Sequence, residues 1–196
     1  MIRLFSALTG LCVMMVGIVG CSSSSPAVAD RPALESDARR TVTLATKQDP
    51  TLQAFFDHSA GYAVFPRVAK GGVGIGGAHG RGVLFQRGRL VGYCDLTQAS
   101  IGLQLGGQTY SELIFFETPP ALKRFQSGEF TVAAQATAVA LKSGSGAIAD
   151  YSDAVAVFTL NESGLMGEAS VGGQRFRYVP AEQGPASMTP EQRTGW

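Results

Sequence analysis

The chain has 196 residues, 45% of them hydrophobic, and its 16 Lys and Arg residues nearly balance its 15 Asp and Glu residues. A formal net charge of +1 argues against the broad basic field of a nucleic-acid-binding protein. Cys12 and Cys21 lie near the N-terminus, which leaves Cys94 alone in the rest of the chain. The fold therefore depends on a hydrophobic core, and roughly 165 residues are enough for one domain.

The N-terminus has the pattern of a bacterial lipoprotein signal peptide. Arg3 precedes an apolar run from residue 4 to 19, which is short for a membrane span. The run ends in Ile18-Val19-Gly20-Cys21, which resembles the lipobox whose cysteine is acylated, with palmitate among the acyl chains. An ordinary secretory signal with an incidental cysteine is the alternative. We expect residues 1–20 to be a signal peptide and Cys21 to be the lipidated residue.

Residues 21–31 follow as a segment rich in Ser, Ala and Pro, which is typical of a flexible tether. Several acyl chains on one cysteine anchor a protein stably to a bilayer. Ser22, and not Asp, follows Cys21, which in a Gram-negative cell favours the outer membrane. We expect a lipid-anchored outer-membrane protein that faces the periplasm, with a folded domain at residues 32–180 and a loosely ordered tail at 181–196.

Three helices are predicted within the domain. Residues 32–48 carry apolar side chains at spacings of four, four and three, and a helix there should end before Pro50. This segment has few long aliphatic side chains, so we expect it to pack on the sheet and not on a membrane. Residues 51–58 indicate a second, short helix, and residues 119–126 a third that begins after Thr118.

The remaining pattern predicts short β-strands. In residues 100–108, Ile101, Leu103 and Leu105 alternate with glycine and glutamine, which indicates one packed face and one bare or polar face. The segment 110–117 is ambiguous between strand and helix. Further strands are expected at residues 62–65, ended by Pro66; at 82–86 and 90–96 around a turn at 87–89; at 154–161 and 165–171 around a turn at 162–164; and at 174–179.

Paired glycines recur after an aliphatic residue at three places, residues 76–77, 106–107 and 172–173. Glycine weakens a strand unless a bend or a close approach requires it. Three such points are what a strongly curved sheet needs at its corners. The predicted fold class is α+β, with a strongly curved or barrel-like antiparallel sheet and the N-terminal and mid-chain helices packed against it.

Residues 70–85, KGGVGIGGAHGRGVLF, contain seven glycines in sixteen residues. Three of them satisfy G-x-G-x-x-G, but a dinucleotide-binding loop opens a helix, whereas this segment continues into the strand pattern of residues 83–85. The segment is therefore predicted to be a bare, curved strand, and what lies against it, a helix of the domain or a lipid, is left open. Its glycine-rich face consists of Gly71, Gly72, Gly74, Gly76 and Gly77.

Residues that carry catalytic or metal chemistry are sparse. The two histidines, His58 and His79, are not followed by the spacing of a metal or hydrolase motif, and Cys94 in a strand fits a small buried hydrophobe. An enzyme would need Cys94, Asp95 and His79 to be brought together by the fold. We expect no catalytic site, no metal and no cofactor.

Basic residues surround the glycine-rich strand and the turn that follows it. If that strand folds back against the hairpin, they converge beside exposed backbone N–H groups and form a seat for an anionic headgroup. The alternative is ordinary solvated surface. The candidate headgroup-binding residues are Arg67, Lys70, His79, Arg81, Arg87 and Arg89.

Three stretches, GYAVFP from Gly61, KGG-x-GIGG from Lys70 and IGLQLGGQ from Ile101, resemble the SYLF family, also called the Las17-binding or DUF500 family. The likeness extends over residues 45–178, and Lys70 matches a basic position in the family's VFP-x-V-x-K-G pattern. The resemblance implies a non-enzymatic module that binds membrane lipids, phosphoinositides in eukaryotic members, and actin in some yeast members. Envelope lipid is thus the expected partner, with a protein partner or homo-oligomer as the alternative and no nucleic acid.

Overall fold

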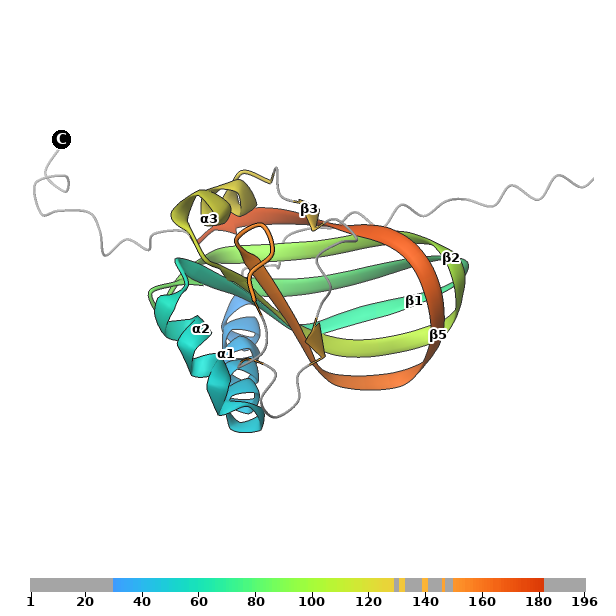
Figure 1. The fold of residues 1–196 in the computed structure, drawn as a ribbon, viewed down its shortest axis with the longest axis horizontal. Coiled ribbons are helices and arrows are strands. Elements are labelled where there is room, and N and C mark those ends of the chain that lie inside the picture. Colours follow the sequence, from blue (N-terminus) through green and yellow to red (C-terminus); the bar gives the residue numbers. More distant parts are fainter. Residues whose placement is uncertain (1–29, 129–130, 133–138, 141–145, 147–149, 182–196) are drawn as a thin grey trace, which may run out of the picture.

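The structure is a computed structural model that describes residues 30–128, 131–132, 139–140, 146 and 150–181. Within these residues, three α-helices and one short 3₁₀ helix precede or interrupt a five-stranded sheet (Figure 1). The predicted signal peptide, almost all of the tether and the C-terminal tail lie outside the described residues. The elements in chain order are α1 (Arg31–Gln48), η2 (Pro50–Leu52), α2 (Gln53–His58), β1 (Gly61–Gln86), β2 (Arg89–Phe116), α3 (Pro119–Gln126), β3 (Thr131–Val132), β4 (Val139–Ala140) and β5 (Val155–Pro180).

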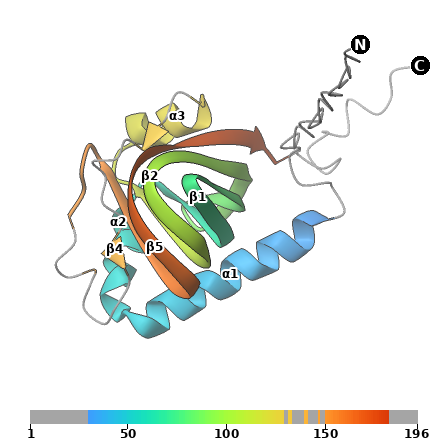
Figure 2. The same cartoon turned by 90° about the vertical axis from the view of Figure 1, so that its right-hand side faces the viewer.

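The sheet has the order β1-β2-β5-β3, and β4 adds a short parallel contact to β5. β1 pairs antiparallel with β2 from Gly61↔Phe116 to Gln86↔Arg89, and β2 pairs with β5 over a similar length. Because the three long strands stay paired while each turns back on itself, they nest as U-shaped bends (Figure 2). The predicted α+β fold with a strongly curved antiparallel sheet is confirmed, and the sheet does not close into a barrel.

The predicted breaks between short strands are wrong, because β1, β2 and β5 are each continuous, including at residues 97–99 and 172–173. Pro66 does not end a strand, because β1 runs through it at a register shift between Phe65 and Val68, where a bulge tolerates a residue without an N–H group. Residues 162–164 do not form a turn, since β5 is continuous there. The partners of Thr109 and Ser111 are three residues apart on β5, so the turn-like residues accommodate a bulge and not a hairpin.

The predicted turn at residues 87–89 is confirmed as a two-residue hairpin loop between the paired residues Gln86 and Arg89. Arg87 and Gly88 have φ of 50° and 72°, the left-handed backbone that tight hairpins with this twist require. The ambiguous segment 110–117 is strand up to Phe116. All three predicted helices are present, and the Thr118 hydroxyl caps α3 by accepting from the Ala121 N–H.

Two hydrophobic clusters form the core. The inner cluster lies between the two halves of the bent sheet and under α3, and includes Phe65, Leu96 and Phe176. The outer cluster lies between the sheet and α1 and α2, and includes Ala38, Phe85 and Phe115. The prediction that the first helix packs on the sheet is thereby confirmed. Within the described residues, no helix is both long and apolar enough to span a bilayer.

Candidate functional site

The glycine-rich strand is bare because the two halves of β1 pack against each other. A Cβ atom on Gly82 would lie 2.6 Å from the Val64 carbonyl oxygen, and one on Gly72 would lie 2.4 Å from Gly76 Cα. Both distances are below any real Cβ contact, so only glycine permits this approach. The surface that covers these glycines is thus neither a helix nor an open ligand site, but the same strand after its bend.

The bend itself lies at Gly74, which has φ of +70° and open space around its Cα. Paired glycines meet on neighbouring strands beside it, as the pairs Gly71↔Gly107 and Gly72↔Gly106 show. The predicted glycine-rich face is therefore divided. Gly72 serves the internal contact, whereas Gly74 lies at the exposed bend.

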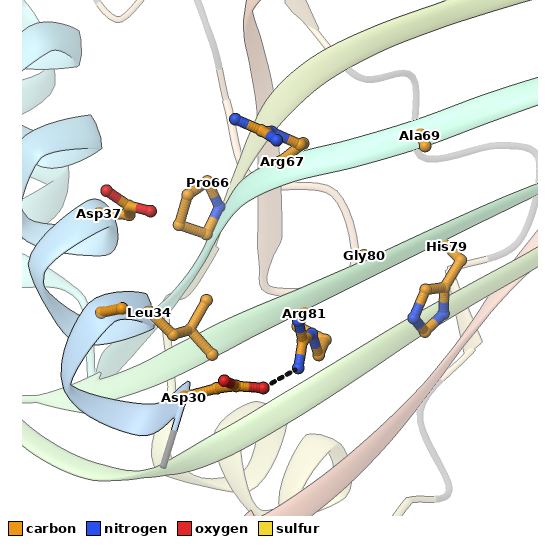
Figure 3. Close-up of a pocket in the computed structure, with 10 residues that line it drawn as sticks. Asp30, Leu34, Asp37, Pro66, Arg67, Ala69, His79, Gly80 and Arg81 are labelled. Atoms are coloured by element: carbon orange, nitrogen blue, oxygen red, sulfur yellow. Dashed lines mark hydrogen bonds and ion pairs between the residues drawn. The ribbon is translucent and has the colours of Figure 1, made fainter. Parts of the chain in front are cut away.

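A cavity of about 420 Å³ opens where the N-terminus of α1 crosses the two halves of β1 (Figure 3). Arg67 comes from the first half of β1, and His79 and Arg81 come from the second half. These side chains are five to seven residues from the bend at Gly74 and are exposed. The other residues that line the cavity are Asp30, Ala33, Leu34, Asp37, Pro66, Ala69 and Gly80.

The cavity carries charges of both signs. Arg81 Nη1 lies 3.3 Å from Asp30 Oδ2, and Asp37 is 3.8 Å from Arg40, which lies outside the cavity lining. Arg67 has no hydrogen-bond or ion-pair partner among the described residues. Exposed ion pairs are weak and exchange readily with other partners. The arrangement thus offers one unpaired guanidinium, one exchangeable guanidinium and one imidazole to an anionic group.

Lys70, which carries the family likeness, lies beside the cavity and not in its lining. It is half-buried, and its charge acts on the buried Glu112 of β2. Burial raises the pKa of Glu112 to about 7, while a hydrogen bond from Gln174 and the Lys70 charge lower it in part. Gln174 Nε2 donates to Glu112 Oε2 at 3.0 Å and so joins the two halves of the bent sheet. The placement of Lys70 indicates an internal electrostatic role as well as proximity to the rim.

Arg87 and Arg89 are not brought to this site. They lie in and beside the β1–β2 turn, at the end of the second half of β1 that is farthest from the bend. Both are exposed. Of the six candidate headgroup residues, the structure therefore gathers Arg67, His79 and Arg81, places Lys70 next to them, and leaves the two turn arginines apart.

An exposed apolar surface at the bend was not predicted. Val73 pairs with Leu105 and Ile75 pairs with Ile101, and the four side chains are 67% to 76% exposed. We call these residues the bend patch. The expectation of a packed aliphatic face in residues 100–108 is wrong for Ile101 and Leu105, because at the bend of the sheet both side chains are exposed. The strict alternation was the available signal, but it does not tell which face is covered.

The residues considered for catalysis do not form a site. Cys94 is buried in the inner cluster, and burial raises the pKa of its thiol well above the usual range. Asp95 is bound by Arg177, with Asp95 Oδ2 2.7 Å from Arg177 Nη2, whereas His79 is exposed in the cavity. His58 Nδ1 lies 2.8 Å from the Ala54 carbonyl oxygen at the end of α2. In the part of the chain that the structure describes, no group of three or more His, Cys, Asp or Glu residues is arranged to hold a metal.

Residues 97–180 match a family model described as "Ysc84: Las17-binding protein actin regulator". The predicted likeness to the SYLF family is thus confirmed for residues 97–180. The matched range contains most of β2 and all of α3 and β5. It contains none of β1, which the structure shows to be paired with β2. A protein of Aeromonas veronii named "Beta cell expansion factor A" is 25% identical over 148 residues, which are 74% of this chain and 56% of that protein.

The chain thus spans about half the length of this curated relative. The family supports a binding module related to lipid or to actin regulation. The residues around the cavity and the bend are those that could bind a ligand or partner.

Proposed function

We propose that this protein is a non-enzymatic, lipid-anchored module of the outer membrane that binds anionic lipid headgroups at the bent end of its sheet. The observation that carries the proposal is the convergence of Arg67, His79 and Arg81 on one cavity. Arginine donates two parallel hydrogen bonds to phosphate oxygens, and a partly enclosed site strengthens them relative to water. Phosphate oxygens compete with Asp30 for Arg81, whose ion pair is exposed.

The uncharged sequence around the bend also supports a membrane contact at the bent end of the sheet. Neither β1 from Gly71 to Ala78 nor β2 from Leu96 to Ser111 contains a charged residue. Basic side chains begin directly on either side of the β1 stretch, at Lys70 and His79. The basic side chains can therefore contact the headgroup layer, while the uncharged bend places no charged group in the apolar part of the membrane.

Vesicle flotation tests the proposal with a chain that starts at Asp30. Both core clusters consist of residues after that position, so this chain keeps the whole described core. We expect it to float with vesicles containing phosphatidylglycerol and to remain unbound with phosphatidylcholine alone. Equal, negligible binding to both would remove headgroup binding as a function.

A pair of double variants separates the cavity from general attraction. The cavity variant combines Arg67→Gln with Arg81→Gln, and the turn variant combines Arg87→Gln with Arg89→Gln. Each variant removes two positive charges. At about 1 kcal/mol for each basic residue at an anionic surface, the cavity variant should bind at least about tenfold more weakly. The turn variant should keep most of its affinity. Equal losses in both would indicate diffuse attraction and no site.

A protein partner is the second candidate function, and the bend patch together with the family's description as a Las17-binding actin regulator favours it. Such a partner would be a protein of the envelope, a second copy of the chain, or an actin-related protein where the cell meets a host. Cross-linking at native concentration tests it. A strictly monomeric chain with no cross-linked protein counts against this function.

A further inference from the structure

The bend patch is the feature that headgroup binding alone leaves unexplained. Its four aliphatic side chains expose on the order of 500 Å² of apolar surface, a patch size that on soluble proteins is often functional. Val73 pairs with Leu105 and Ile75 pairs with Ile101 on either side of the register shift at Gly74, so the four side chains gather at the bend. Solvent exposure of this surface is costly unless something covers it.

The shape of the surface restricts what covers it. The three long strands turn together at this end (Figures 1 and 2). Inside the bend a Cβ atom on Gly72 would meet Gly76, so the neighbouring Val73 faces the outer, convex side and not a groove. A standard protein interface buries about 800 Å² on each partner, more than the patch supplies. A bilayer requires no complementary shape, and it accepts a convex apolar tip.

The charges around the patch are arranged as a bilayer requires. Arg67 and Val73 are both exposed on β1, and strand alternation places His79 on the same face as Ile75. At about 3.3 Å per residue, His79 lies roughly 13 Å from Ile75 and Arg67 roughly 20 Å from Val73 along the strand. Basic groups at that height meet the headgroup layer while the aliphatic groups lie deeper. β5 contributes one charged position near the bend, Glu168, which pairs with Gln104 and lies beyond β2 from the patch.

We propose that Val73, Ile75, Ile101 and Leu105 enter the acyl-chain region of the bilayer while the cavity arginines contact the headgroups. This inference rests on the proposed function, because it takes the same membrane as partner and names the part of the fold that penetrates it. The domain then inserts the bent tip of its sheet and does not merely adsorb to the surface.

Depth-dependent fluorescence quenching tests insertion. The chain has a single tryptophan, Trp196, so a Trp196→Phe background with Ile75→Trp places one reporter in the patch. Because Ile75 is 72% exposed, the larger side chain meets no packed neighbour. On phosphatidylglycerol vesicles whose acyl chains are brominated, we expect strong quenching and a blue-shifted emission. The same background with Arg87→Trp, at the far turn, is the matched control and should show neither.

The outcomes separate the inference from the proposed function. Flotation together with quenching at position 75 supports both, and flotation without quenching overturns insertion alone. Absence of flotation overturns both. The double variant Ile75→Ser with Ile101→Ser should lower the vesicle partition coefficient at least roughly tenfold. If sedimentation instead shows a wild-type dimer that this variant dissociates, a second copy of the chain covers the patch and insertion is wrong.

Discussion

The contact between Glu112 and Gln174 predicts how the stability of the bent sheet depends on pH. Glu112 is 1% exposed, and its Oε1 and the Oε1 of Gln174 are buried without a hydrogen-bond partner among the described residues. A proton on Glu112 removes the charge that burial disfavours and leaves the hydrogen bond from Gln174 Nε2 in place. Burial accordingly raises the pKa of this carboxyl from 4.5 to about 7.

The sign of the effect follows from proton binding. Between pH 4.5 and about 7, the folded chain holds a proton that the unfolded chain has released, so the free energy of unfolding falls as the pH rises. Below this interval the contribution is fully present, and above it the contribution is lost. At about 1.4 kcal/mol for each pH unit, the interval corresponds to a loss on the order of 3 kcal/mol.

The substitution Glu112→Gln should remove this pH dependence. Its neutral amide still accepts from Gln174 Nε2, and no ionisable group is buried there at any pH. At about pH 8 we expect the variant to be more stable than the wild type by roughly 2–3 kcal/mol, and at about pH 5 the two should be similar. Urea denaturation at the two pH values measures both free energies of unfolding.

Glu117→Gln removes an exposed carboxylate from the same segment and is the control, which should follow the wild type at both pH values. The reasoning is refuted if the wild type loses no more stability than Glu112→Gln between the two pH values. It is also refuted if Glu112→Gln is less stable than the wild type at about pH 8.

Three further outcomes follow from close contacts and burial. Gly82→Ala should lower the free energy of unfolding by roughly 1–3 kcal/mol in chemical denaturation, because its Cβ overlaps the backbone of the facing half of β1. Gly107→Ala is the control and should change this free energy little, because its Cβ would meet its nearest backbone atom at 3.6 Å. Cys94 should react with a thiol reagent only at the rate of unfolding, and rapid labelling of the folded chain that starts at Asp30, which lacks Cys12 and Cys21, would contradict its burial. Arg177→Ala should lower the melting temperature by leaving Asp95, which is 3% exposed, without its cation, and an unchanged melting temperature would show that water replaces the arginine.

The helices and the turn at residues 87–89 were predictable because their signals are local. Apolar spacing, Thr118 before a proline pair and a glycine in a tight turn act within a few residues. The strong curvature was predictable from the paired glycines. The continuity of β1 and β5 was not, because Pro66 and residues 162–164 have the composition of strand ends, and only their partners on β2 show that they are bulges.

The candidate site was predictable in part. Arg67, His79 and Arg81 were among the expected basic residues, but their convergence depends on β1 folding back on itself, which the sequence shows only through its glycines. Arg87 is also a basic residue near the glycines in the sequence, but it lies in the β1–β2 turn, away from the cavity. The bend patch was missed because alternation predicts that one face is apolar, and which face is buried is decided by the path of the bend.

Amide hydrogen exchange with and without phosphatidylglycerol vesicles tests most directly whether the bent end of the sheet is the membrane-contacting surface. The account predicts slower exchange in residues 67–81 and 97–108 when vesicles are present, and unchanged exchange in α3 and in the turn at residues 87–89. Slower exchange confined to α3 or to that turn, in a chain that floats with the vesicles, would contradict it.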